Sequence, residues 1–418
     1  MIVFLFTQSY PYDAAAEQTF LEKEVEHLSS NFEKVVLVPQ RCSGSRSETP
    51  LNVEVVREYS DLNDPRNSRT TRLWHTFLLS GMICKELDSR RTLILKPSTV
   101  RRLADFISWA EHTNRWICRY LRDNRLDPKQ CIFYTYWFDR TSLGVGLAKR
   151  RHPSICLVSR AHGHDLYEER SEGSYIPFRR ASLHLVDKLF PDSDRGTRYL
   201  TERYPRWADK YETARLGVSD PGFLTARSKD GVLRIVSCSF LVPVKRVDLI
   251  LRGIGHAAKL RPSQRFEWNH FGTGDLKKDL EALAEHSLPS NVRYYFRGYA
   301  SQESLMQFYR ENRVDLFMNL SKSEGTPVAA MEAISCGIPI VATAVGGNPE
   351  IATEENGILL SQNPSLSEVA NALFFFLDQP ALAESKGLGS RRVWDERYNA
   401  ERNFKDFVRR LKEMRACH

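Results

Sequence analysis

The chain has 418 residues, more than one hydrophobic core usually organises, so we expect two domains of roughly 200 residues each. Hydrophobic residues make up 42% and charged residues 27%, a globular balance that excludes a disordered or fibrous protein. The net charge of +8 would suit nucleic acid, but no helix-turn-helix, zinc-finger or RNA-binding signature accompanies it, so we expect no nucleic acid partner.

Two more classes of protein are excluded by residue pattern. No run reaches the roughly 18–20 apolar residues that cross a bilayer. The N-terminal segment MIVFLFTQSYPYD lacks a basic leader and a cleavage site, and it predicts a buried strand rather than a signal peptide. The eight cysteines are scattered and form no C-x-x-C pair, so we expect no zinc site, no disulfide framework and a cytoplasmic location.

Short apolar runs alternate with helical periodicity along the whole chain. This alternation predicts an α/β fold with two Rossmann-like, doubly wound parallel sheets. The predicted strands cover residues 2–6, 35–38, 53–56, 131–136, 155–159 and 183–190 in the first half, and 233–237, 266–271, 292–296, 315–319, 338–342 and 357–360 in the second.

One long helical pattern, at residues 97–125, is amphipathic. Its apolar positions include Leu103 and Ile107, while Trp109 and Trp116 lie among several arginines. Such a helix either covers a sheet or lies on an anionic membrane, and the sequence leaves both open.

Turn-forming residues at 219–222 and 228–231 mark a break between the halves. We therefore predict an N-terminal domain over 1–216 and a second domain over 217–395. A charged helix over 396–418 is expected to pack back toward the first domain. Ligands of doubly wound sheets bind beyond the carboxyl ends of the strands, where we look for a site.

The richest motif, residues 323–333, follows a predicted strand and opens a helix. Gly325 permits close ligand approach, and Pro327 suits the first helical turn. The free N–H groups of such a turn suit a phosphate. Glu324 and Glu332 lie eight residues apart, about two turns, and two carboxylates can hold sugar hydroxyls. A helix cap with acidic residues that favour the helix dipole explains the same residues without a ligand.

Two other loops of the second half are candidates. Lys245 and Arg246 follow a predicted strand and precede a helix, where cations can neutralise a diphosphate leaving group. A solvated basic pair is the alternative, although a helix start disfavours cations. Gly346 and Gly347 follow another strand and predict a tight turn with exposed backbone N–H groups.

Taken together, these loops resemble the donor domain of the family-4 glycosyltransferases, retaining enzymes of the GT-B fold. The resemblance includes the Glu-x7-Glu signature at Glu324 and Glu332, the basic loop at Lys245, the FGTG turn at 271–274 and the Gly346–Gly347 turn. It implies that Glu324 contacts the donor sugar, that Glu332 holds the ribose and that Lys245 binds the diphosphate. The remaining residues that it implies at the donor are Arg297, Gly298, Tyr299, Gly325, Thr326, Pro327 and Val328.

One position departs from that family. A Gly-Arg-Leu triplet usually precedes the lysine, but this chain reads Ser239, Phe240 and Leu241. We expect Arg246 to replace the missing cation; a weakened donor site is the alternative.

The first half carries a weaker resemblance. The stretch from Arg160 to Asp165 resembles the family's His-Gly-x-Asp loop, which implies that His162 lines the site beside the donor sugar. We assign His162, Lys245 and Glu324 as catalytic. The loop at 7–16 stands where the family has its glycine-rich acceptor loop, but the glycines are absent. The predicted acceptor-binding residues are Tyr10, Tyr136, Trp137 and His164.

These observations predict a retaining, metal-independent hexosyltransferase without a cofactor. Its expected partners are a UDP- or GDP-sugar donor, a glycan or lipid-linked glycan acceptor, and peripheral contact with an anionic membrane. The motifs are similar to those of family members in bacterial surface-polysaccharide assembly. The Asp192-Ser193-Asp194 spacing falls outside a suitable metal loop. A non-catalytic sugar-nucleotide or glycan-binding subunit, or a nucleotide-sugar isomerase of the same fold, remains the alternative.

Overall fold

The computed structural model describes residues 1–12, 15–60, 68–89 and 97–416, and it divides into two compact units. The first contains Met1–Arg215 and the chain from Phe404 onward; the second contains Leu216–Asn403. The chain leaves the first unit at Arg215, one residue before the end of the domain predicted over 1–216.

The first unit is built on a six-stranded parallel sheet in the order β3-β2-β1-β4-β5-β6. Its central strand β1 pairs with β2 on one side and with β4 on the other, the order of a doubly wound sheet. The strands are β1 (Ile2–Thr7), β2 (Lys34–Pro39), β3 (Val53–Val55), β4 (Cys131–Thr135), β5 (Cys156–Ala161) and β6 (Lys188–Pro191).

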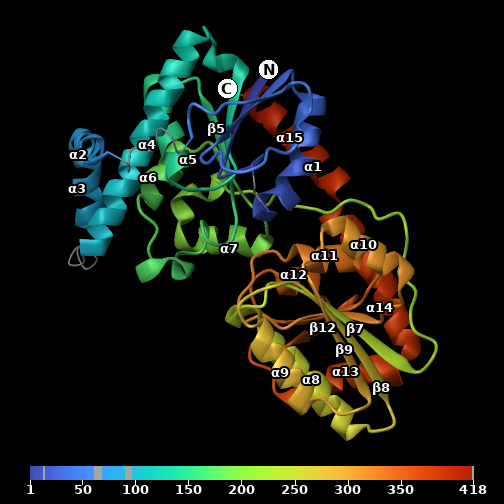
Figure 1. The fold of residues 1–418 in the computed structure, drawn as a ribbon. Helices are drawn as coiled ribbons and strands as arrows, with labels where there is room; N and C mark the ends of the chain where they lie inside the picture. The colour runs from blue at the N-terminus through green and yellow to red at the C-terminus, as the bar shows by residue number, and fades with distance from the viewer. Residues whose placement is uncertain (13–14, 61–67, 90–96, 417–418) are drawn as a thin grey trace. The chain divides into compact units, whose positions relative to one another are not determined.

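Alternate residues of β1 enter two different cores, because successive side chains of a strand point to opposite faces of the sheet. Phe4 and Phe6 pack with residues of α4 and α5, whereas Val3 and Leu5 pack with residues of α1 and α15. Figure 1 shows these helix pairs on the two sides of the sheet. The helices of this unit are α1 (Ala15–Asn31), α2 (Arg69–Leu78), α3 (Ser80–Ser89), α4 (Pro97–Asp123), α5 (Arg140–Arg151), α6 (Arg179–Leu185), α7 (Asp194–Arg203) and α15 (Ala400–Ala416).

The long helix α4 covers the sheet. Leu103 and Ile107 of its apolar stripe are buried, and both of its tryptophans, Trp109 and Trp116, lie in the core at 0% and 4% exposure. Both tryptophans of the helix therefore pack inside the unit, and this face of the helix covers the sheet. Among the described residues, no helix combines the length and the apolarity that a bilayer crossing requires.

One predicted strand was too long. Residues 183–185 belong to α6, and β6 begins only at Lys188. Leu185 packs on Gly146 of α5, where an added Cβ would lie 2.7 Å from the Leu185 Cβ. A short apolar run is compatible with a buried helix as well as with a buried strand. Periodicity alone therefore could not show where the helix ends and the strand begins.

The C-terminal helix α15 completes the core of the first unit. Phe407 packs edge-on against Tyr134 and Phe190, with ring centroids 5.4 and 5.2 Å apart. The guanidinium of Arg160, fully buried, lies 4.1 Å from the Phe407 ring centroid and donates to Glu24. Burying an Arg–Glu pair costs desolvation free energy, which further hydrogen bonds of Arg160 to the Tyr134 hydroxyl and the Ala214 carbonyl offset.

The second unit repeats the architecture with the strand order β12-β11-β10-β7-β8-β9, all parallel. The predicted doubly wound α/β fold is confirmed in both units. Its strands are β7 (Val232–Cys238), β8 (Arg265–Phe271), β9 (Val292–Gly298), β10 (Leu316–Asn319), β11 (Ile340–Thr343) and β12 (Gly357–Leu360). Its helices are α8 (Val247–Leu260), α9 (Lys277–Ser287), α10 (Gln302–Glu311), α11 (Val328–Ser335), α12 (Asn348–Ile351), α13 (Leu366–Asp378) and α14 (Pro380–Val393).

Candidate active site

Glycines let the loops beyond the carboxyl ends of β7, β8 and β9 pack backbone to backbone. Gly272 has φ 140°, and a Cβ there would lie 1.9 Å from the Ser239 carbonyl oxygen. The Ser239 N–H donates to the Phe271 carbonyl at 2.9 Å, and the Gly272 N–H donates to that of Gly298 at 2.7 Å. The FGTG turn therefore fixes the loop that leads to Lys245.

A second glycine contact supports Glu324. Gly346 has φ 54°, and a Cβ there would lie 1.9 Å from the Glu324 carbonyl oxygen. The N–H of Gly347 donates to the Gly325 carbonyl at 2.9 Å. The Gly346–Gly347 turn thus lies directly on the backbone that carries Glu324 and Gly325, and only residues without a side chain permit that approach.

Lys245 and Glu324 form an ion pair at the point where these loops meet. The Lys245 Nζ lies 2.6 and 2.8 Å from the two carboxylate oxygens of Glu324. Glu324 Oε1 also accepts from Ser321 Oγ at 2.6 Å and Asn319 Nδ2 at 3.2 Å. The Glu324 side chain is 6% exposed and that of Lys245 22%, so the carboxylate is fixed while the ammonium still reaches solvent.

The Arg246 side chain connects the loop after β10 with the loop after β12 through hydrogen bonds. Its Nε donates to the Leu320 carbonyl at 2.7 Å, and its Nη2 donates to the carbonyls of Ser321 and Gln362 at 2.8 and 2.9 Å. Its Nη1 donates to the Asn363 side chain at 3.2 Å. Four hydrogen bonds of the guanidinium are thus made to the protein, and burial lowers its pKa. These bonds hold the guanidinium of the predicted second phosphate cation against the backbone at residues 320–321 and 362–363.

Glu332 is a buried carboxyl about one turn into α11. Its residue exposure is 5%, and burial raises its pKa to about 8, against a smaller lowering by a hydrogen bond with the Gln302 side chain. A carboxyl kept partly protonated at neutral pH in an enclosed site marks a candidate functional position.

The start of α11 differs by one residue from the prediction. The helix begins at Val328, and Pro327 is the N-cap residue with extended backbone rather than part of the first turn. A Cβ added at Gly325 would meet nothing within 4 Å, so open space adjoins this backbone, next to Thr326. The first N–H groups of any helix lack partners within it, which leaves those of α11 available to an anion.

The residues expected against the nucleotide base lie at the end of β9. Arg297 donates from Nε to the Asn269 side chain at 2.9 Å, and its guanidinium stacks over Tyr295 with 4.5 Å to the ring centroid. Gly298 has φ 75°, which turns the chain, and Tyr299 is 71% exposed. The loop therefore offers a cation and an unburied aromatic ring.

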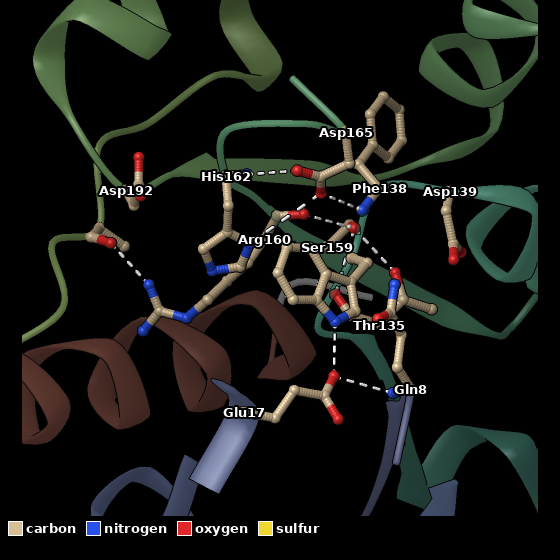
Figure 2. Close-up of polar contacts among 12 residues, drawn as sticks. Gln8, Glu17, Thr135, Phe138, Asp139, Ser159, Arg160, His162, Asp165 and Asp192 are labelled. Carbon is tan, nitrogen blue, oxygen red and sulfur yellow. Dashed lines mark hydrogen bonds and ion pairs between the residues drawn. The ribbon is translucent and has the colours of Figure 1, made fainter. Parts of the chain in front are cut away.

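His162 is buried at the carboxyl end of β5 in the first unit. Its backbone N–H donates to Asp165 Oδ1 at 2.8 Å, and the Phe138 N–H donates to Asp165 Oδ2 at 2.8 Å (Figure 2). Burial would raise the Asp165 pKa, but its contacts with His162 and His164 and these hydrogen bonds lower it to about 2. Both ring nitrogens of His162 lack a hydrogen-bond partner among the described residues, although the residue is only 7% exposed.

Aromatic rings surround the His162 imidazole. The rings of Tyr136 and Trp137 each lie 4.6 Å from it between centroids, and Trp137 also lies 4.5 Å from the His164 ring. Tyr10 and Tyr136 are 2% and 0% exposed and belong to the core, whereas Trp137 is partly exposed and His164 exposed. The four predicted acceptor residues thus divide into two core residues and two surface residues.

Glu17 was missed by sequence reasoning. Its Oε1 accepts from the Trp137 indole N–H at 2.6 Å and from the Gln8 N–H at 2.9 Å (Figure 2). Its Oε2 accepts from the N–H groups of Ser9 and Tyr10 at 2.7 and 2.9 Å. One carboxylate therefore holds both the loop after β1 and the Trp137 ring. Residues 13 and 14 of this predicted loop lie outside the described residues. An acidic residue in the first turn of the helix that follows the loop was the available signal.

A pocket of about 340 Å³ adjoins His164. Apolar groups of Phe106, Phe138 and Ile176 line it together with Asp139 and Arg140. Most of the lining residues are polar or charged, Arg102, Asp105 and Asp165 among them, so the pocket suits a polar ligand. Among the described residues, no group of three or more His, Cys, Asp or Glu is arranged to hold a metal ion.

Comparisons with known proteins agree with this arrangement. Residues 226–392 match the family described as "Glycosyl transferases group 1". The amylovoran biosynthesis glycosyltransferase AmsK of Erwinia amylovora is 29% identical over 154 residues, which cover 34% of this chain and 36% of that protein. The match therefore spans about a third of that relative's length.

Solved structures match over nearly the whole chain. A lipopolysaccharide outer core galactosyltransferase, WaaB, aligns with a TM-score of 0.68 at 14% identity, covering 97% of this chain and 98% of that one. Sucrose-phosphate synthase from Thermosynechococcus elongatus aligns with a TM-score of 0.69 at 15% identity over 100% of both chains. The chain therefore has the GT-B fold, and its second unit matches the glycosyl transferases group 1 family.

Proposed function

We propose that the protein is a retaining glycosyltransferase that moves a sugar from a UDP- or GDP-sugar to a glycan or lipid-linked glycan. The observation that carries the proposal is the Lys245–Glu324 pair beside the start of α11, within the segment that matches the glycosyltransferase family. Three kinds of group for a nucleotide-sugar adjoin one another there: a cation, a fixed carboxylate and unpaired helix N–H groups.

In the proposed reaction Lys245 and the first turn of α11 take the diphosphate of the donor. Negative charge grows on that group as its bond to the sugar breaks, and prepositioned positive charge lowers the barrier. Because the Arg246 guanidinium is already bonded to the protein, we assign this cationic role to Lys245. The same positive groups take the place of a metal ion, so the reaction is proposed to be metal-independent.

The two carboxyl groups of the motif hold the rest of the donor. Glu324 accepts hydrogen bonds from sugar hydroxyls, and Glu332 accepts them from the ribose. Arg297 and Tyr299 lie against the base. Charge-assisted hydrogen bonds of this kind fix the orientation of the sugar before the bond breaks.

His162 has a positioning role toward the reacting sugar in this proposal. The bond between sugar carbon and phosphate oxygen breaks, the acceptor oxygen bonds to the same face of that carbon, and the acceptor proton passes to the departing phosphate. The sugar therefore keeps its configuration. The imidazole of His162, whose Nδ1 lies 4.0 Å from Asp165 Oδ2, is proposed to orient a sugar hydroxyl, and Trp137 and His164 are proposed to contact the acceptor.

The names of similar proteins support the substrate classes. The AmsK relative is named for amylovoran biosynthesis and the WaaB structure for the lipopolysaccharide outer core, which supports a role in surface polysaccharide assembly at the cytoplasmic face of the membrane. A solved structure of Anabaena HepE, 13% identical, contains UDP and glucose. A Corynebacterium glutamicum relative, 23% identical over 280 residues, is described as GDP-mannose-dependent. We therefore propose either UDP or GDP as the nucleotide of the donor.

A thermal-shift panel followed by a transfer assay tests the function. A saturating nucleotide that binds only the folded state raises the unfolding free energy by about 3 kcal/mol at a hundredfold excess over Kd. We expect UDP or GDP, but not both, to give such a shift. The matching nucleotide-sugar should then release nucleoside diphosphate with transfer to a glycan. Binding without any turnover across a donor panel would instead favour a binding subunit, and turnover without an acceptor would favour an isomerase.

A further inference from the structure

A groove of about 930 Å³ lies on the first unit, and none of the residues that line it is assigned to sugar transfer. It is lined by α3, α6, the ends of α2 and α5, and the chain just after α7. One set of lining residues is apolar, formed by Leu78, Met82 and Trp207. The other set is cationic and consists of Lys85, Arg150, Arg180 and Arg206, all of them exposed.

The charges in this groove are not balanced. The lining contains one carboxylate among the described residues, that of Glu86, which accepts hydrogen bonds from the Tyr175 hydroxyl at 2.6 Å and the Phe178 N–H at 3.1 Å. A fifth cation of the lining, Arg203, is paired with Glu168. Four further cations therefore face one carboxylate, and an anionic ligand would find favourable potential.

Exposed apolar side chains adjoin the groove on α2. Trp74, Phe77 and Leu78 are 55%, 70% and 44% exposed, and their i, i+3, i+4 spacing places them on one side of the helix. The Trp74 and Phe77 rings stack with centroids 6.2 Å apart. His75 is buried, with Nδ1 3.2 Å from the Ser108 carbonyl of α4, so another side of α2 packs inward. Contiguous exposed aromatic surface marks an interaction site.

We propose that this groove binds the phosphate headgroups of anionic phospholipids while Trp74 and Phe77 enter the interface of the same bilayer. Phospholipid headgroups and soluble phosphate compounds carry the same phosphate group, but a soluble phosphate would make no contact with the exposed aromatic pair. A bilayer engages both features at once, because interfacial aromatic rings and clustered cations each add to membrane affinity. The contact differs from the one considered for residues 97–125, and it does not depend on sugar transfer.

Sedimentation with vesicles tests the proposal on the full chain. We expect at least about tenfold more protein bound to phosphatidylcholine vesicles with about 30% phosphatidylglycerol than to phosphatidylcholine alone. Raising the NaCl concentration from about 0.05 to 0.5 M should release most of it, because the screening length shortens severalfold. Equal binding to both vesicles, or none to either, would overturn the proposal.

Paired variants locate the site. Arg180→Gln with Arg206→Gln should lower anionic-vesicle binding about 25-fold, since each cation near the surface contributes about a factor of five. The control, Arg252→Gln with Lys278→Gln on exposed positions of α8 and α9, changes the net charge equally and should bind as wild type. Equal loss in both pairs would show general charge attraction and overturn the groove assignment.

The aromatic half and the phosphate source are tested separately. Trp74→Ala with Phe77→Ala should also lower vesicle binding about tenfold, whereas Leu260→Ala, at a 57% exposed leucine of the second unit, should not. Inorganic phosphate at the concentration of the lipid phosphate should leave the protein on the vesicles. Full displacement by it would identify a soluble-phosphate site instead of a bilayer contact, and unchanged binding of the aromatic variant would contradict insertion.

Discussion

The Lys245 ammonium and the Glu324 carboxylate are joined through both carboxylate oxygens, at 2.6 and 2.8 Å. Glu324 is held independently by Ser321 and Asn319, so it keeps its position when Lys245 turns to another anion. In the proposed reaction, Lys245 pairs with the donor diphosphate instead of Glu324, and Glu324 accepts hydrogen bonds from the sugar hydroxyls. The free protein thus keeps both groups in place without a ligand.

Lys245→Ala should therefore abolish most of the transfer reaction. Removing a prepositioned charge that stabilises a leaving group lowers kcat by a factor on the order of 10² to 10³. The matched control is Lys322→Ala. Lys322 is an exposed cation two residues before Glu324, and its backbone N–H donates to the carbonyl of Val244, the residue before Lys245. Steady-state kinetics measure kcat for both variants. A wild-type kcat in Lys245→Ala would show that Lys245 does not stabilise the leaving group.

The pKa of Glu332 predicts a pH dependence of stability. Burial raises this pKa from 4.5 to about 8, so the folded state binds more protons than the unfolded state between these values. The free energy of unfolding therefore falls as pH rises from 4.5 to 8, by about 4 kcal/mol from this group. Urea unfolding of Glu332→Gln should lack that part of the decline; parallel curves for the two proteins would contradict it.

Donor binding should release a proton from the same carboxyl. Ribose hydroxyls donate to the ionised form and stabilise it, which lowers the Glu332 pKa. At pH 7 we expect a fraction of a proton to be released per nucleotide bound. Calorimetric titrations in two buffers of different ionisation enthalpy measure this number, and Glu332→Gln should reduce it to near zero.

Because of His270, we expect the free energy of unfolding to show the opposite dependence on pH in the acidic range. This buried imidazole lies 2.8 Å from Ser237 Oγ and 3.2 Å from the Ser239 carbonyl, and burial lowers its pKa from 6.5 to about 4. The unfolded state binds more protons in that window, so stability is lost as pH falls from 6.5 to 4, by about 3 kcal/mol. In His270→Asn the free energy of unfolding should decrease less between pH 6.5 and 4. An unchanged decrease would show that other groups cause it.

The glycine contact behind Glu324 can be tested with two neighbouring glycines. Gly346→Ala places a methyl 1.9 Å from a backbone oxygen at positive φ, which should lower the free energy of unfolding by about 2–4 kcal/mol. Gly325→Ala meets no atom within 4 Å and should change it by less than about 0.5 kcal/mol. Equal denaturation midpoints for the two variants would contradict the packing described.

Trp137→Phe tests the support of His162. The phenyl ring keeps the aromatic contact but loses the N–H that donates to Glu17. If Glu17 acts through Trp137, kcat should fall about tenfold in Trp137→Phe, and adding this change to Glu17→Gln should lower kcat no further. Nucleotide affinity, which belongs to the second unit, should stay the same. Multiplying effects on kcat in the double variant would show that the two residues act independently.

All twelve strands were predictable from the sequence because buried parallel strands are continuous apolar runs between turns. The resemblance of short motifs singled out Lys245, Glu324 and Glu332 as candidates, and the structure brings the first two together in one ion pair. The roles of Arg246 and Glu17 could not be predicted, since they depend on partners far along the chain: Gln362 lies 116 residues from Arg246, and Trp137 lies 120 from Glu17. The burial of Tyr10 and Tyr136 likewise follows from packing that no motif encodes.

The most direct measurement is a crystal structure with the UDP- or GDP-sugar that gives the thermal shift. We expect the diphosphate oxygens at hydrogen-bond distance, about 3 Å, from Lys245 Nζ and from the first N–H groups of α11, with Glu324 on the sugar. A diphosphate bound elsewhere, with Lys245 still paired to Glu324, would contradict the account.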